Sequence, residues 1–203
     1  FSGDMSWSSG CDHAQWAIMG FIRAGAKVDA KPHQHFALVP RSNYEIIDNW
    51  HAMAMKGSGT KVLKVRDVFV PEHRIESAKA LMTGQSSGYG MYPDSDIFFA
   101  AYRPYFACGF SAISLGIAEQ MVSWFTERSK TRVRAYTGAE VGKDVPAYMR
   151  LAESKHQINA ARALLEKDWN DLAQMGVKHA LPDADQLAQW RTNQAYAVKM
   201  CVT

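Results

Sequence analysis

The spacing of apolar residues changes near residue 95, and this change constrains the fold more than any other feature. Before it, three runs rich in β-favouring residues are bounded by turn-forming or polar stretches, as strands are. These runs cover residues 14–22, 35–39 and 61–70. In the last run Leu63 and Val65 share one face, while Lys64 between them faces the other. The first part of the chain therefore predicts a small antiparallel β domain.

After residue 95, apolar residues recur every three or four positions, which is the period of an amphipathic helix. The first stripe contains Phe106, Phe110, Ile113, Ile117, Met121 and Phe125; the second contains Leu151, Ile158, Leu165, Trp169 and Leu172; the third contains Leu187, Trp190, Gln194, Ala197 and Cys201. Three long helices separated by loops indicate part of an up-down bundle. We therefore predict an α+β fold, with a β domain at residues 1–95 and a helical bundle domain at residues 96–203.

Composition and charge exclude several classes of protein. The 203 residues are 47% hydrophobic and 21% charged, with a net charge of +3 and both signs interspersed, which gives no basis for binding nucleic acid. The sequence has no run of about 18 apolar residues and no signal-peptide pattern, so we expect a cytoplasmic protein without a membrane partner. Cys11, Cys108 and Cys201 are scattered, which indicates reduced thiols. Both ends interrupt a regular pattern, so we expect a segment of a longer protein that lacks both ends.

Two motifs with possible chemistry give weak signals. No metal site is predicted, because no cluster of His, Cys, Asp or Glu has ligand spacing. Residues 56–61, KGSGTK, are rich in glycine but lack the full spacing of a phosphate-binding P-loop and run into a strand. A hairpin turn and a ligand-contacting loop both fit this segment.

The segment WSSGCDHAQW, residues 7–16, places small polar residues between two tryptophans. This pattern suits a strand end that faces a flat ligand with polar edges. Ser8 and Ser9 lack the Gly-x-Ser-x-Gly elbow of a catalytic serine, so we interpret them as hydrogen-bond donors to a ligand. Local capping of the turn is an equal alternative from the pattern alone.

Three arginines are further candidates for binding. Arg103 lies between aromatic residues in YRPY at an expected helix start, where its planar guanidinium suits a carboxylate. The alternative is a structural ion pair with Asp94 or Asp96. Arg132 and Arg134 follow the end of the same helix in RVRAYTG. They are candidates for binding a phosphate, although cations are also favoured at a helix C-terminus for electrostatic reasons alone.

The order of these motifs resembles the acyl-CoA dehydrogenase fold, in which an antiparallel β domain lies between helical domains and a flavin binds at their junction. The blocks SSGCDHAQW and DVFVPEHR are similar to its monooxygenase branch, the oxygenase components of two-component flavin hydroxylases. The similarity continues through the blocks YRPYFACGFSAISLGIAE, RVRAYTG, ARALLEK and WRTNQAYAVKMC. Together these blocks cover essentially the whole chain.

The resemblance implies an aromatic monooxygenase that hydroxylates a phenolic acid ortho to its OH through a flavin 4a-hydroperoxide, with molecular oxygen as co-substrate. It implies reduced FMN, or FAD, delivered by a separate flavin reductase, and it implies a homotetramer. The sequence has no Gly-x-Gly-x-x-Gly motif for a nicotinamide, which agrees with reduction by another protein. The enzyme alternatives are a hydroxylase of a steroid-derived or polycyclic phenol and an acyl-CoA dehydrogenase. The non-enzymatic alternative is an oligomerisation bundle.

The resemblance also implies roles for individual residues. Ser9, with Ser8 beside it, matches the hydroxyl that bonds flavin N5. Arg132, with Arg134 nearby, matches a contact to the flavin phosphate. Arg103 matches the position that holds the carboxylate of the aromatic substrate. Further active-site residues are expected outside the chain, so we expect that the chain alone is not a competent enzyme.

Overall fold

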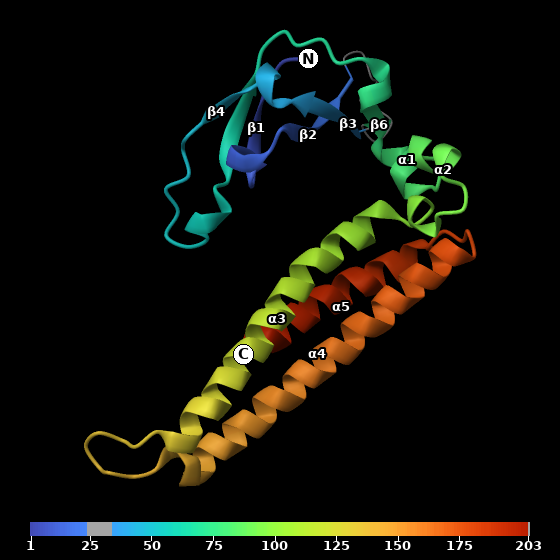
Figure 1. The fold of residues 1–203 in the computed structure, drawn as a ribbon. Helices are drawn as coiled ribbons and strands as arrows, with labels where there is room; N and C mark the ends of the chain where they lie inside the picture. The colour runs from blue at the N-terminus through green and yellow to red at the C-terminus, as the bar shows by residue number, and fades with distance from the viewer. Residues whose placement is uncertain (24–33, 203) are drawn as a thin grey trace. The chain divides into compact units, whose positions relative to one another are not determined.

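The computed structural model describes residues 1–23 and 34–202 (Figure 1). It divides into two compact units, Phe1–Met91 and Tyr92–Thr203. Sequence analysis placed the boundary after residue 95. The first unit holds all six strands of the described residues, and the second holds the three long helices. The predicted α+β class is therefore confirmed.

The first unit contains two antiparallel sheets of three strands each. One sheet has the order β1 (Gly3–Ser8), β5 (Lys61–Val65) and β4 (Glu45–Ile47). The other has the order β2 (Trp16–Ile22), β3 (Gln34–Pro40) and β6 (Ile75–Ser77). The three runs predicted as strands fall on β2, β3 and β5. Strand β5 ends before residue 70, because Asp67 adopts a left-handed conformation (φ 50°) that an extended strand does not accommodate.

Side chains from both sheets form one hydrophobic core. Its buried members are Cys11, Met19, Ala37, Val39, Tyr44, Leu63 and Val65. Leu63 and Val65 are almost completely buried, whereas Lys64 is partly exposed, as the alternation along β5 predicts. Two short helices, α1 (Ala78–Met82) and α2 (Ser87–Met91), follow β6. The carboxylate of Glu76 accepts hydrogen bonds from the backbone N–H groups of Ser77 and Ser87, which ties α2 to the end of the sheet.

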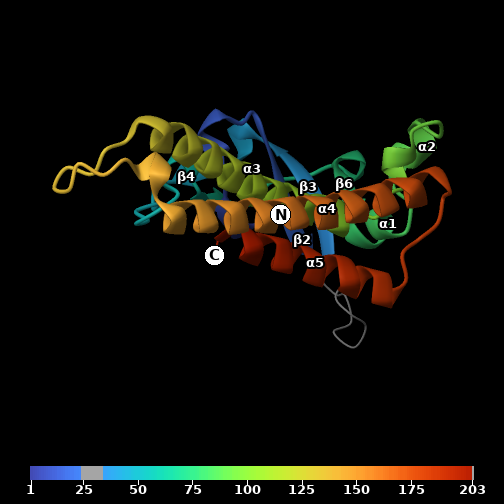
Figure 2. The same cartoon turned by 90° about the horizontal axis from the view of Figure 1, so that it is seen from below.

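The second unit consists mainly of α3 (Tyr102–Thr131), α4 (Val145–Val177) and α5 (Ala184–Val202). The three helices lie side by side in Figures 1 and 2 and alternate in direction, as predicted for part of an up-down bundle. Pro104 lies in the first turn of α3, where its missing N–H breaks no helical hydrogen bond. The buried cluster between the helices contains Leu115, Ala118, Ile158, Ala161, Leu165 and Ala197.

The stripes predicted for the second and third helices lie on the packed faces of α4 and α5. Ile158, Leu165 and Leu172 are buried in α4, and Trp190 and Ala197 are buried in α5. These predictions are confirmed.

The stripe that predicted α3 is not the face that packs against α4 and α5. Its large side chains are exposed in the chain, from 41% for Phe125 to 63% for Phe110. The packed face instead carries Ser111, Leu115 and Ala118, because small side chains let helices approach closely. The apolar period therefore predicted the helix correctly, but it marks a second apolar face of α3.

Among the described residues, α3 is also the one helix that is long and apolar enough to cross a membrane. A single helix of this kind is weak evidence for a membrane span, because core helices of water-soluble proteins meet the same criterion. The expectation of no membrane partner came from the absence of a continuous apolar run in the sequence, and it stays a prediction.

Candidate functional site

The end of β1 departs from regular strand geometry at the segment WSSG. The pairing of β1 with β5 is irregular between Met5 and Ser8. Within this irregularity Trp7 adopts a left-handed conformation (φ 63°), which is costly for a bulky residue and concentrates at functional sites. Its side chain is 78% exposed and meets the Trp50 ring edge-to-face, with the ring centroids 5.9 Å apart. An aromatic pair, with Trp7 exposed and Trp50 partly buried, therefore stands beside the two candidate serines.

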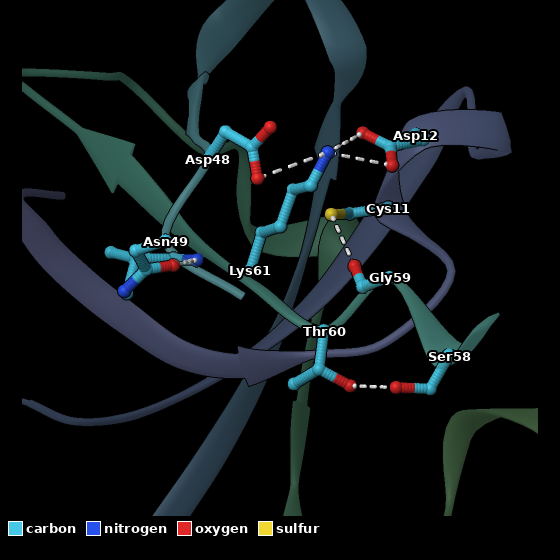
Figure 3. A network of polar contacts seen from close by, with 9 residues as sticks. Cys11, Asp12, Asp48, Asn49, Ser58, Gly59, Thr60 and Lys61 are labelled. Atoms are coloured by element: carbon cyan, nitrogen blue, oxygen red, sulfur yellow. Dashed lines mark hydrogen bonds and ion pairs between the residues drawn. The ribbon is translucent and has the colours of Figure 1, made fainter. Parts of the chain in front are cut away.

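Ser9 takes part in a chain of three hydroxyl groups. Its Oγ lies 2.8 Å from Oγ1 of Thr60, and the Oγ of Ser58 lies 2.8 Å from the same Thr60 atom (Figure 3). Thr60 is buried, whereas Ser9 is exposed. The buried hydroxyl of Thr60 thus holds the oxygen of Ser9 in place, while Ser9 itself stays open to solvent.

Ser8 is oriented differently. Its hydroxyl donates a hydrogen bond to the carbonyl oxygen of Met5 at 3.1 Å. A serine hydroxyl has one proton, so Ser8 uses its donor within the turn. Of the two candidate serines, Ser9 is the one that the structure leaves available to a ligand.

An ion-paired lysine holds the segments around these hydroxyls together. The Nζ of Lys61 lies 2.9 Å from a carboxylate oxygen of Asp12 and 3.7 Å from one of Asp48 (Figure 3). The hydrogen bond to Asp12 raises the pKa of Lys61, so the amine remains charged. In addition, the backbone N–H of Gly10 donates to the carbonyl oxygen of Ser58 at 3.0 Å. The turn after β1 therefore meets both ends of the connection between β4 and β5 at one end of this sheet.

The glycine-rich segment is not a tight hairpin turn. It forms one 3-10 turn, Lys56–Ser58, flanked by left-handed residues at Met55 and Gly59. It belongs to the long connection between β4 and β5 and contributes Ser58 to the hydroxyl chain. The geometry therefore does not support the tight hairpin turn, and the ligand-contacting loop stays a prediction.

The donors at this strand end fit the edge of a flavin ring. Hydroxyl groups and backbone amides suit the ring's nitrogens and carbonyl oxygens, and exposed aromatic side chains suit its planar faces. Gly10, with φ 72°, has open space where a Cβ would project, so the backbone can approach a ligand closely.

Arg132 and Arg134 line an open cleft within the helical unit. The cleft has a volume of about 710 Å³, and its lining includes Arg150 of α4 as well as Phe125. Arg134 forms an ion pair with Asp144 at 2.6 Å. Neither Arg132 nor Arg150 forms an ion pair within the described ranges 1–23 and 34–202. Two unpaired guanidinium groups beside one cleft are suited to an anion such as a phosphate.

Arg103 lies in the first turn of α3 and is exposed. Asp96 is one of the structural partners that the sequence offered for Arg103. Its Oδ1 lies 3.8 Å from Nε2 of His179. Arg103 does not line the cleft that contains Arg132. The two arginines lie at opposite ends of α3, which has 30 residues and is therefore about 45 Å long.

Comparison with known proteins agrees with this architecture. The family model "Acyl-CoA dehydrogenase, C-terminal domain" matches residues 108–203. The p-hydroxyphenylacetate 3-hydroxylase oxygenase component of Acinetobacter baumannii is 59% identical over 99% of the chain and 47% of its own length. The flavin-dependent monooxygenase oxygenase subunit HsaA of Mycobacterium tuberculosis strain CDC 1551 is 35% identical over 89% of the chain and 46% of its own length.

A solved structure gives the same result. The crystal structure of the HsaA monooxygenase from M. tuberculosis superposes with a TM-score of 0.84 and 30% identity, over 99% of this chain and 50% of that one. The chain thus shares the acyl-CoA dehydrogenase-like fold and is similar, along almost its whole length, to oxygenase components of flavin-dependent monooxygenases. The resemblance predicted from the sequence is thus confirmed. The chain spans about half the length of the curated relatives it matches.

Sequence reasoning missed three residues that the structure places beside the predicted ones. Ser58 and Thr60 join Ser9, and Arg150 joins Arg132. The glycine-rich segment was a usable signal for the first two. Arg150 carried no local signal, because it faces Arg132 only once α4 folds back along α3.

Proposed function

We propose that the full-length protein is the oxygenase component of a two-component flavin-dependent monooxygenase. In this proposal it hydroxylates a phenolic acid, 4-hydroxyphenylacetate, ortho to its OH. One observation carries the assignment, namely the 59% identity along almost the whole chain to an oxygenase component named for p-hydroxyphenylacetate. The hydroxyl chain at the end of β1 supports it, because that site suits the polar edge of a flavin.

The proposed cofactor is reduced FMN, with FAD as the alternative. When bound, reduced flavin activates molecular oxygen, so that one oxygen atom enters the aromatic ring and the other leaves as water. The chain's own residues bind and orient the cofactor and shape the surroundings of the reacting atoms. Electrons arrive with flavin that a separate reductase has reduced, which fits the absence of a Gly-x-Gly-x-x-Gly motif from the sequence.

Ser9 is the proposed contact to flavin N5. The bond from Thr60 at 2.8 Å holds the oxygen of Ser9 in place before a ligand binds. A polar group that is already oriented stabilises a developing charge without the cost of reorganising around it. Ser8 supports the same turn through its bond to the carbonyl of Met5.

Arg132 is the proposed contact to the flavin phosphate, with Arg150 beside it. Both line the cleft and neither is neutralised by an acid within the described part of the chain. Arg134 is assigned a weaker role, because its guanidinium is already paired with Asp144. Phosphate binding to guanidinium groups is charge-assisted and bidentate, which supports this use of Arg132.

Arg103 is the proposed contact to the substrate carboxylate. Because Arg103 and Arg132 lie about 45 Å apart along one helix, a single copy does not place both of them around one flavin and one small aromatic acid. Two copies of the chain would have to contribute to each site. This requirement, together with the exposed apolar face of α3, supports the proposed homotetramer.

Binding and product analysis test the proposal on the full-length protein. Anaerobic titration should show tight binding of reduced FMN and weak binding of oxidised FMN, and addition of oxygen with 4-hydroxyphenylacetate should give the ortho-dihydroxy acid on chromatography. Tight binding of oxidised FAD, with reduction by an acyl-CoA thioester, would instead identify a dehydrogenase. Turnover of polycyclic phenols alone would assign a different substrate.

A further inference from the structure

We propose that Thr60 is a positioning residue for Ser9, and that Ser58, Thr60 and Ser9 form a reversible hydroxyl relay. The direction of its hydrogen bonds would follow the protonation of the ring nitrogen that Ser9 contacts. This inference rests on the proposed function, which assigns Ser9 to flavin N5. It adds Thr60 and Ser58 to the proposed flavin site and gives a reason for the arrangement of the three hydroxyl groups.

The geometry of Thr60 carries the inference. Its Oγ1 lies 2.8 Å from the hydroxyl oxygens of both Ser9 and Ser58, and its residue is only 5% exposed. Within residues 1–23 and 34–202, these two hydroxyls are the hydrogen-bond partners of the Thr60 side chain. A threonine hydroxyl has a single proton and two acceptor lone pairs. Thr60 therefore donates to at most one neighbour and can accept from the other.

Two arrangements satisfy this constraint. In the first, Ser58 donates to Thr60 and Thr60 donates to Ser9, which leaves the proton of Ser9 for the ligand. In the second, Ser9 donates to Thr60 and Thr60 donates to Ser58, which leaves a lone pair of Ser9 to accept from the ligand. The change between them requires only rotation of hydroxyl protons, because all three oxygens keep their positions.

These two arrangements match the two states of the flavin ring. N5 has no proton in the oxidised ring, so it accepts a hydrogen bond, whereas N5 carries a proton in the reduced ring and donates one. With the relay, Ser9 satisfies either state without movement of a side chain. Each hydroxyl in such a chain also strengthens the next, because hydrogen bonds in series polarise one another.

Threonine suits the central position for a structural reason. Its β-branched side chain has few χ1 rotamers, and burial at the start of β5 restricts it further, so its oxygen has one position. Thr60→Val keeps this shape and removes the hydroxyl. Ser9 would then lose its fixed partner and would rotate freely at the exposed end of the turn.

Four variants of the full-length protein test the relay: Thr60→Val, Thr60→Ser, Ser9→Ala and the double variant Ser9→Ala/Thr60→Val. One readout is the affinity for reduced and for oxidised FMN, measured by anaerobic titration. The other is the hydrogen peroxide released per molecule of hydroxylated product. Loss of one neutral hydrogen bond corresponds to roughly a three- to tenfold change in such ratios. Thermal unfolding of each variant confirms that it is folded.

We expect Thr60→Val to raise peroxide release and weaken flavin binding by about this factor, and Thr60→Ser to restore both to the wild-type values. The double variant should match Ser9→Ala, because Thr60 acts through Ser9. If Thr60→Val does not fold, Ser58→Ala interrupts the relay at its outer end and should shift the ratio in the same direction.

Three results would overturn the relay. The first would be that Ser9→Ala increases peroxide release while Thr60→Val leaves it unchanged. The second would be that Thr60→Val has its full effect in the Ser9→Ala background. The third would be that Thr60→Ser does not restore the ratio of peroxide to product. A separate result, in which Ser9→Ala itself changes neither readout, would contradict the proposed contact between Ser9 and flavin and would remove the relay with it.

Discussion

The carboxylate of Asp168 in α4 accepts hydrogen bonds from the side-chain amide of Asn193 in α5, with Nδ2 at 2.9 and 3.0 Å from its two oxygens. Asp168 is only 2% exposed. The ion pair between Arg162 of α4 and Glu119 of α3 lies at the surface, so the buried contact of Asp168 is the stronger link between two helices. It supports the packing of α5 on α4 in the helical unit.

Asn193→Ala should destabilise the packing of α5 on α4. The substitution leaves the Asp168 carboxylate buried without its donor, and the loss of a hydrogen bond to a charged group costs about 1.5–3 kcal/mol. Hydrogen exchange of the α5 amides in the full-length protein measures this free energy of opening. Gln189→Ala is the matched control, because it removes an exposed bond to the same Asn193 and adds an alanine to the same helix. Equal effects of the two variants would contradict the account.

The stability of the helical unit should fall as pH rises because of Asp168. Burial raises the pKa of Asp168, although the bond from Asn193 opposes this shift. Above the ordinary carboxyl pKa of about 4, the unfolded chain releases the proton while the native state still retains it. The free energy of unfolding therefore falls as pH rises, until the pH passes the raised pKa of Asp168 in the native state. Asp168→Asn removes the effect, so the melting temperatures of variant and wild type should diverge as pH rises above about 4; parallel profiles would contradict it.

Ser9→Ala should weaken flavin binding only by the roughly three- to tenfold expected for one lost hydrogen bond, but it should also shorten the time before oxidised flavin reappears after mixing with oxygen. Loss of one oriented hydrogen bond at a charge-bearing site typically costs about 2–4 kcal/mol. Stopped-flow absorbance of the full-length protein measures this delay. Ser8→Ala is the control, because the Ser8 hydroxyl is directed to the carbonyl of Met5. An unchanged delay in Ser9→Ala would remove Ser9 from the mechanism.

Arg132→Ala should weaken binding of reduced FMN by about 1.5–3 kcal/mol, the scale of a hydrogen bond to a charged group. Reduced riboflavin, which has no phosphate, should bind wild type and variant alike. Arg134→Ala should have a smaller effect, since Arg134 is already paired with Asp144. The assignment fails if the affinity for riboflavin falls as much as the affinity for FMN.

Much of the fold followed from hydrophobic periodicity. The alternation around Leu63 and Val65 predicted a strand with one buried face, and the three stripes predicted α3, α4 and α5. The packed face of α3 did not follow, because close helix packing uses small residues such as Ser111 and Ala118, and these carry little hydrophobic signal.

The candidate site was only partly predictable. Ser9 was recognisable from its segment, but its partner Thr60 is 51 residues away along the chain, and only strand pairing brings the two together. The left-handed conformation of Trp7 also had no sequence signal, because a bulky residue there contradicts local preference. Such departures depend on the surrounding tertiary structure.

Incorporation of isotopically labelled oxygen tests the central claim most directly. The full-length protein, loaded anaerobically with reduced FMN and 4-hydroxyphenylacetate, is mixed with oxygen-18 gas, and the product is analysed by mass spectrometry. The account predicts an ortho-dihydroxy acid that carries one oxygen-18 atom, formed only when reduced flavin is present. A product with oxygen from water, or labelled hydrogen peroxide with no hydroxylated acid, would contradict it.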